Sequence, residues 1–121
     1  MSRARRGRDL RRPDLAPLLA RWIPRLGLET WAIQWRWDSG MSDLATCQAE
    51  AEYATAELLF HPALARHPRE AIEEVVLHEL CHCLTARLAG LALEQASVNE
   101  LAGAEEDLVS RLTRLFLRAY R

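Results

Sequence analysis

The first apolar pattern in the chain has the period of a helix. Large apolar residues recur every three or four positions, at Leu15, Leu18, Leu19, Trp22, Ile23 and Leu26. Asp14 precedes this run as a candidate N-cap, and Pro24 and Gly27 follow as residues that end helices. The spacing predicts an amphipathic helix over residues 14–25.

The period changes to two after residue 30. Large apolar residues now alternate with small or polar ones, at Trp31, Ile33, Trp35 and Trp37. This alternation is typical of a strand with one apolar face. A second alternating segment covers residues 45–52, and a third extended segment covers residues 55–60. Three short strands in succession predict an antiparallel meander.

Two longer helices are predicted in the C-terminal half. Pro68 opens the first in a favoured position, and the helix runs to about Leu88, with Gly90 as its terminator. Ser97 and Glu100 form an S-x-x-E capping box for the second, which continues to the end of the chain. The order predicts an α+β fold with an N-terminal helix, a three-stranded antiparallel sheet and two C-terminal helices.

Length and charge fit one domain that follows a basic segment. The chain has 121 residues, of which 50% are hydrophobic, and its formal net charge of −1 favours no particular partner. Arginine is frequent in the first twelve residues, and no aromatic residue lies between the arginines to stack on bases. We expect residues 1–12 to be a disordered basic tail and residues 13–121 to be the domain. Contact of the tail with nucleic acid is the alternative.

Neither targeting signals nor cysteine usage indicates secretion. No apolar run reaches the roughly 20 residues of a membrane span, and none follows the arginines as in a secretory signal. Cys47, Cys81 and Cys83 are too few for a disulfide framework, and they are odd in number. We expect them to be small core or half-exposed residues rather than a zinc pair. We expect the protein to be cytoplasmic and to make no contact with a membrane.

The candidate chemistry lies in the pentapeptide His78-Glu79-Leu80-Cys81-His82. On a helix, His78 and His82 project from one face and can bind one metal ion. Glu79 lies about 100° around the helix from His78, where it can take a proton from metal-bound water. Two imidazoles with a carboxylate base suit zinc. Apolar residues precede the motif on its own face, so unpaired polar groups there would be costly. This favours a shared metal over histidines that are merely packed or exposed.

A catalytic zinc site needs a third protein ligand, and no histidine follows the motif. The downstream acids are Glu94, Glu100, Glu105, Glu106 and Asp107. Glu105 falls on the apolar stripe of the last helix, whereas Glu106 and Asp107 point away from the centre of the stripe. In an antiparallel helix pair, Glu105 and His82 would both lie about 12 Å from the connection. The register therefore predicts Glu105 as the third ligand, and an ion pair of Glu105 with Arg111 or Arg114 is the alternative.

With this pentapeptide and a glutamate on a following helix, the chain resembles the gluzincin metallopeptidases. It is most similar to the single-domain minigluzincin type and to small metallopeptidases of bacteria and phages, over about residues 30–118. The resemblance implies a zincin-like fold in which the HExxH helix packs antiparallel to the glutamate helix. It implies one zinc ion per chain, held by His78, His82 and Glu105, with Glu79 as general base and acid.

The chain departs from the gluzincin pattern at one position. Many gluzincins carry an acid four residues after the ligand glutamate, which steadies a metal-bound histidine, and Val109 occupies that place after Glu105. The residue that orients the zinc histidines is therefore not assigned by the resemblance, although such residues affect affinity and rate.

The expected function is that of a zinc metallopeptidase acting on a peptide or protein substrate. Zinc-bound water would attack the peptide carbonyl, Glu79 would move the proton, and the substrate would lie along residues 58–60 by strand addition. The alternative is a zinc-stabilised binding module without activity, tethered to nucleic acid through the arginine-rich N-terminus. The exposed edges of a three-stranded sheet would also allow a homo-oligomer.

Overall fold

The computed structural model describes residues 12–92 and 98–120 of the chain. Its elements, in chain order, are α2 (Ala16–Arg25), β1 (Ala32–Trp37), β2 (Ala45–Glu50), β3 (Thr55–Phe60), the 3-10 helix η1 (Pro62–Arg66), α3 (Arg69–Ala92) and α4 (Val98–Ala119). The predicted α+β order is confirmed. Residues 1–11 of the predicted basic tail and Ser97 of the predicted capping box lie outside the described residues.

The sheet is mixed, so the predicted all-antiparallel meander is wrong. β3 lies between the other strands, parallel to β1 and antiparallel to β2. β3 is the most apolar of the three and buries Ala56, Leu58, Leu59 and Phe60. A central strand is covered more completely than an edge strand, so this position suits β3. The connection of residues 38–44 is long enough to place β2 beyond β3, about two strand spacings from β1.

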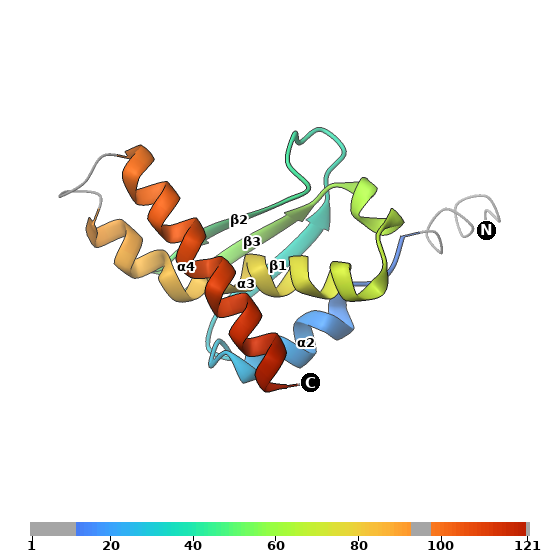
Figure 1. Ribbon diagram of the computed structural model, residues 1–121, viewed down its shortest axis with the longest axis horizontal. Helices are drawn as coiled ribbons and strands as arrows, with labels where there is room; N and C mark the ends of the chain where they lie inside the picture. Colours follow the sequence, from blue (N-terminus) through green and yellow to red (C-terminus); the bar gives the residue numbers. More distant parts are fainter. Residues whose placement is uncertain (1–11, 93–97, 121) are drawn as a thin grey trace.

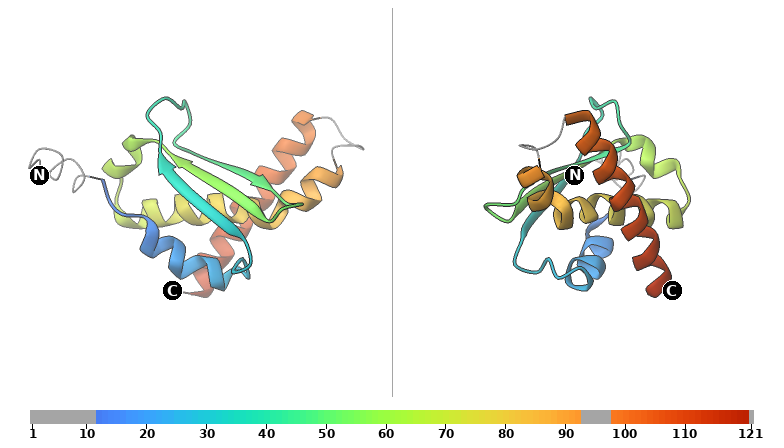
Figure 2. Two further views of the ribbon diagram at one scale, coloured as in Figure 1. Left: turned by 180° about the vertical axis from the view of Figure 1, so that it is seen from behind. Right: turned by 60° about the vertical axis from the view of Figure 1, so that its left-hand side comes forward.

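The described helices lie together on one face of the sheet (Figures 1 and 2). The apolar side chains of β1 and β3 point toward them in register, with Ile33 opposite Ala56, Trp35 opposite Leu58 and Trp37 opposite Phe60. The other face carries Gln34 and Gln48, both exposed, and no helix of the described residues covers it. This one-sided layering places the core between the sheet and α3.

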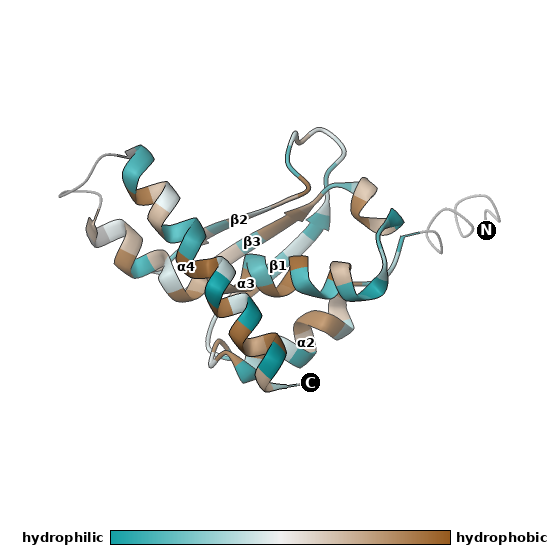
Figure 3. Cartoon of the chain, in the orientation of Figure 1, coloured by the Kyte–Doolittle hydropathy of each residue, from teal (hydrophilic) through white to brown (hydrophobic). Residues whose placement is uncertain are grey.

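α3 is the central helix of the domain and buries one broad apolar face. Val76, Leu77, Leu80 and Cys81 are all 0% exposed, and they lie within about 140° of one another around the helix. This face is covered because α3 is packed against the sheet, α2 and α4. Figure 3 shows that much of β3 is made of hydrophobic residues. α3 runs past Gly90, the predicted terminator, because a glycine inside a helix costs only about 1 kcal/mol.

One tryptophan connects α2 to both later helices. Trp22 is 1% exposed, and its indole N–H donates a hydrogen bond of 2.9 Å to Glu73 of α3. Its ring meets Tyr120, just beyond α4, edge to face at a centroid distance of 5.5 Å. The guanidinium of Arg25 lies over both rings, 4.9 Å from the centroid of Trp22 and 4.4 Å from that of Tyr120. These contacts fix the C-terminal end of α4, which runs back obliquely across α3 (Figure 1).

Candidate metal centre

α3 presents both motif histidines to a cavity. The ring centroids of His78 and His82 are 5.2 Å apart, and their side chains are 26% and 15% exposed. Both line a cavity of about 890 Å³ whose walls come from β2, α3 and α4. The prediction that the two imidazoles share one face of a helix is confirmed.

Carboxyl groups dominate the charge of this cavity. Five of them line it, from Asp43, Glu74, Glu79, Glu105 and Glu106. Among the described residues, the lining includes no arginine. A concentration of negative charge in a concave site attracts cations. Together with two imidazoles, these oxygen donors form a ligand set that fits a divalent metal such as zinc.

Glu79 is the buried member of the group. Its side chain is 6% exposed, and burial raises its pKa from 4.5 to about 7. The nearby His82 lowers this pKa, while Glu106 and Asp43 raise it further. Donor atoms of His78, Glu79 and His82 all lie within 4.8 Å of one another, which makes them the metal-binding candidate among the described residues.

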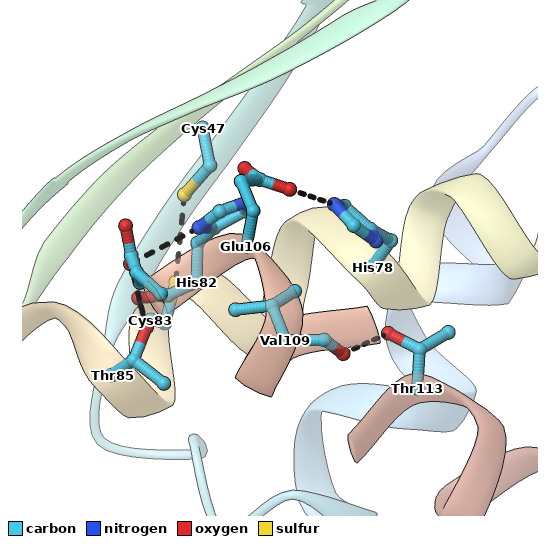
Figure 4. A network of polar contacts seen from close by, with 9 residues as sticks. Cys47, His78, His82, Cys83, Thr85, Glu106, Val109 and Thr113 are labelled. Carbon is cyan, nitrogen blue, oxygen red and sulfur yellow. Dashed lines mark hydrogen bonds and ion pairs between the residues drawn. The ribbon is translucent and has the colours of Figure 1, made fainter. Parts of the chain in front are cut away.

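Glu106 meets both histidines from α4. One of its carboxylate oxygens lies 3.1 Å from Nε2 of His78, and the other lies 3.0 Å from Nε2 of His82 (Figure 4). The side chain of Glu106 is 56% exposed. The two Nε2 atoms therefore converge on a single carboxylate at the cavity wall.

Glu105 contacts the other nitrogen of His82. Its Oε2 atom lies 3.2 Å from Nδ1 of His82 and accepts a hydrogen bond of 2.7 Å from the hydroxyl of Thr85. The prediction that Glu105 lies level with His82 is confirmed. Its role as a metal ligand stays a prediction, because Glu105 contacts Nδ1 of His82, whereas Nε2 of His82 contacts Glu106.

The hydrogen-bond inventory of His82 shows why a cation fits here. A neutral imidazole has one N–H donor and one acceptor nitrogen. If Nδ1 donates to Glu105, Nε2 faces the carboxylate of Glu106 with a lone pair, and two acceptors 3.0 Å apart repel each other. A cation between them, or a second proton on His82, removes this repulsion. A carboxylate that accepts a hydrogen bond from Nδ1 is a usual companion of a metal-bound histidine.

Sequence reasoning missed the contacts of Glu106 and Thr85. The sequence predicts that Glu106 points away from the centre of the apolar stripe on α4. That position would keep Glu106 from the histidines if α4 lay antiparallel to α3 along its whole length. The oblique crossing instead brings neighbouring sides of α4 over the histidines, so both Glu105 and Glu106 reach them. The spacing of Thr85, three residues after His82 on the same helix, was a signal that could have identified it.

β2, and not β3, borders the cavity as an edge strand. Residues 45–47 of β2 line the cavity, while both edges of β3 are occupied by its neighbours. The expectation that a peptide pairs with residues 58–60 is therefore wrong, because the backbone groups of a central strand are already paired. Among the described strands, the unpaired edge nearest the histidines belongs to β2.

Two cysteines meet at this wall of the cavity, which Cys47 itself lines. Sγ of Cys47 on β2 is 3.9 Å from Sγ of Cys83 on α3 (Figure 4). The contact with Cys83 and burial raise the pKa of the Cys47 thiol, and the same contact lowers the pKa of Cys83. Cys81 and Cys83 are buried and Cys47 is partly buried, as expected of core or half-exposed residues.

The fold and the site together define a class of protein. A mixed sheet covered by helices, with a His-Glu-x-x-His helix facing a carboxylate helix across a cavity, is a small zincin-like domain with a candidate metal site. The chain belongs to the SprT-like family, which is related to zinc metallopeptidases, and the family model matches residues 20–95. The match begins within α2, covers the sheet and α3 with the motif, and ends before α4.

The other comparisons give no match, either to curated proteins or to solved structures. In the described part of the chain, the helices are too short or too polar to cross a membrane.

Proposed function

We propose that the protein is a zinc-dependent peptidase that hydrolyses peptide bonds in peptide or protein substrates. The observation that carries the proposal is the convergence of two Nε2 atoms, from His78 and His82, on one carboxylate beside the buried Glu79. Membership in a family related to metallopeptidases supports the same reaction class.

The proposed ligands of one zinc ion per chain are Nε2 of His78, Nε2 of His82 and the carboxylate of Glu106. Glu105 then has a positioning role, because it contacts Nδ1 of His82 and is itself held by Thr85. Such a partner fixes the orientation of the imidazole and raises its basicity. The alternative, in which Glu105 is the third ligand, follows from the helix register predicted from the sequence. The two alternatives predict different zinc contents for the Glu105 and Glu106 variants.

Glu79 is the proposed general base and acid. When bound, zinc supplies a Lewis acid and lowers the pKa of a water ligand toward neutrality. Glu79 accepts the proton of the attacking water and delivers it to the leaving amine nitrogen. In the metal-free protein burial raises the pKa of Glu79 to about 7, so its surroundings favour the uptake of a proton, as a general base requires.

The substrate is proposed to bind in extended conformation along β2. The outer edge of β2 is free among the described strands, and Ala45, Thr46 and Cys47 line the cavity beside the histidines. Backbone hydrogen bonds to an edge strand hold a peptide with little dependence on its side chains. They would bring a substrate carbonyl next to Glu79.

Zinc content of purified variants tests the ligand set. We expect about one zinc per wild-type chain, and loss of the metal in His78→Ala, His82→Ala and Glu106→Ala. Glu105→Ala should retain the site with an affinity lowered by about 10–100-fold. Asp107→Ala is the matched control, because Asp107 is the next acid on α4 and pairs with Arg111 away from the site. Zinc lost with Glu105→Ala and kept with Glu106→Ala would reverse the two roles.

Cleavage of a quenched fluorescent peptide library tests the activity. Wild type loaded with zinc should cleave a subset of peptides, and Glu79→Gln should keep its zinc but lose cleavage. Zinc bound at full occupancy with no cleavage of peptides or unfolded protein would favour the non-catalytic binding module instead.

A further inference from the structure

A pair of cysteines lies where two elements that line the cavity, β2 and α3, are in contact. Cys47 lies on β2 and Cys83 on α3, 36 residues apart in sequence, with their sulfur atoms 3.9 Å apart. Cys83 directly follows His82, and Cys47 itself lines the cavity. Figure 4 shows the Cys47 side chain pointing from the sheet toward α3.

The geometry permits a covalent bond between these two sulfurs. A disulfide needs an S–S distance of about 2.05 Å, so the two sulfur atoms must approach by about 1.9 Å. Cys81 is not an alternative partner. It is 0% exposed, contacts Thr113 of α4, and points to a different side of α3 from Cys83.

We propose that Cys47 and Cys83 form a redox site, in which a peroxide converts the two thiols into a disulfide that fixes β2 to α3. The sulfur of one cysteine attacks the O–O bond of the peroxide and becomes a sulfenic acid, releasing one water from hydrogen peroxide. The sulfur of the other cysteine then displaces the hydroxyl group, which leaves as a second water. Two S–H bonds are lost, one S–S bond forms, and the peroxide gains two electrons.

Oxidation changes how firmly β2 is held to α3 at the cavity wall. In the reduced protein β2 is held to α3 by packing and by the thiol contact alone at this point. In the oxidised protein a covalent link one residue from His82 sets the distance between the edge strand and the motif helix. A dithiol reductant reverses the change. The proposal does not depend on peptidase activity, since it concerns the two sulfurs and the elements that carry them.

Thiol counting on the intact, reduced protein gives the first test. Three free thiols are present before oxidation. After treatment with hydrogen peroxide and unfolding in denaturant, we expect one thiol per monomer, restored to three by dithiothreitol. The Cys81→Ala variant should go from two thiols to none, which assigns the link to Cys47 and Cys83. This variant is needed because no arginine separates Cys81 from Cys83, so trypsin leaves them in one peptide.

Thermal unfolding gives the second test. A cross-link that closes a loop of this length should raise Tm on the order of 10 °C, and the rise should disappear in Cys47→Ser and with dithiothreitol. Three thiols remaining after peroxide treatment, conversion to sulfinic acid without a linked peptide, or a disulfide between two chains on a non-reducing gel would each overturn the proposal.

Discussion

Removing the charge of Glu79 should stabilise the metal-free protein at neutral pH and above. Glu79 is 6% exposed, and burial raises its pKa from 4.5 to about 7. Each pH unit between the folded and unfolded pKa corresponds to about 1.4 kcal/mol, so ionised Glu79 costs the folded state about 3 kcal/mol. Glu79→Gln keeps the shape of the side chain and removes this cost.

The sign of the effect follows from which state ionises first. Below about pH 4.5 the carboxyl group is neutral in both states and contributes nothing. Between about 4.5 and 7 it ionises in the unfolded chain and stays protonated in the folded one, so stability falls as pH rises. Above about pH 7 the carboxyl group is ionised in both states, and the stability of the folded state stays lower by the full amount. The advantage of Glu79→Gln over wild type should therefore be near zero at low pH and reach about 3 kcal/mol at about pH 8.

Urea unfolding in the presence of a chelator measures this difference. Wild type and Glu79→Gln are compared at about pH 4.5, 6 and 8, with Glu74→Gln as an exposed control on the same helix. The control should change stability by less than about 0.5 kcal/mol at every pH. An advantage of Glu79→Gln that is the same at all pH values, or absent at about pH 8, would refute the claim that Glu79 is held in a desolvated environment.

Three further predictions concern single side chains. Thr85→Val removes the hydroxyl that holds the carboxylate beside His82, and should lower zinc affinity by up to about tenfold in a chelator competition assay. Ala54 has a φ of 51°, which is unfavourable for alanine, so Ala54→Gly should stabilise the domain by up to about 1 kcal/mol. Leu58→Ala, at 0% exposure, should cost about 2–5 kcal/mol, whereas Leu88→Ala, at 63% exposure, should change the unfolding midpoint little.

The motif helix could be predicted because its signals are local. Spacing of four residues places His78 and His82 on one face of any helix, and the apolar residues around them require burial. The register that brought Glu105 level with His82 needed only a rise per residue and an antiparallel connection. These inferences used short-range geometry, which the sequence specifies directly.

The strand order and the role of Glu106 depend on contacts between distant segments. Local alternation identifies each strand but does not say which strands pair, and the apolar character of β3 was the available signal for its central place. Whether Glu105 or Glu106 faces Nε2 of the histidines depends on the crossing of α4 over α3. That crossing is fixed in part by Trp22, Arg25 and Tyr120, well away from the site.

The division of the site between two helices links ligand binding to the docking of α4. The histidines belong to α3, whereas Glu106, the proposed third ligand, belongs to α4. A cation can therefore contact all three only when α4 is docked. Cation binding therefore stabilises the docked position of α4. Each tenfold rise in the free cation concentration above its Kd raises the free energy of undocking by about 1.4 kcal/mol. Hydrogen exchange of the α4 amides would thus report cation concentration, and the last helix would act as the sensor element of the domain.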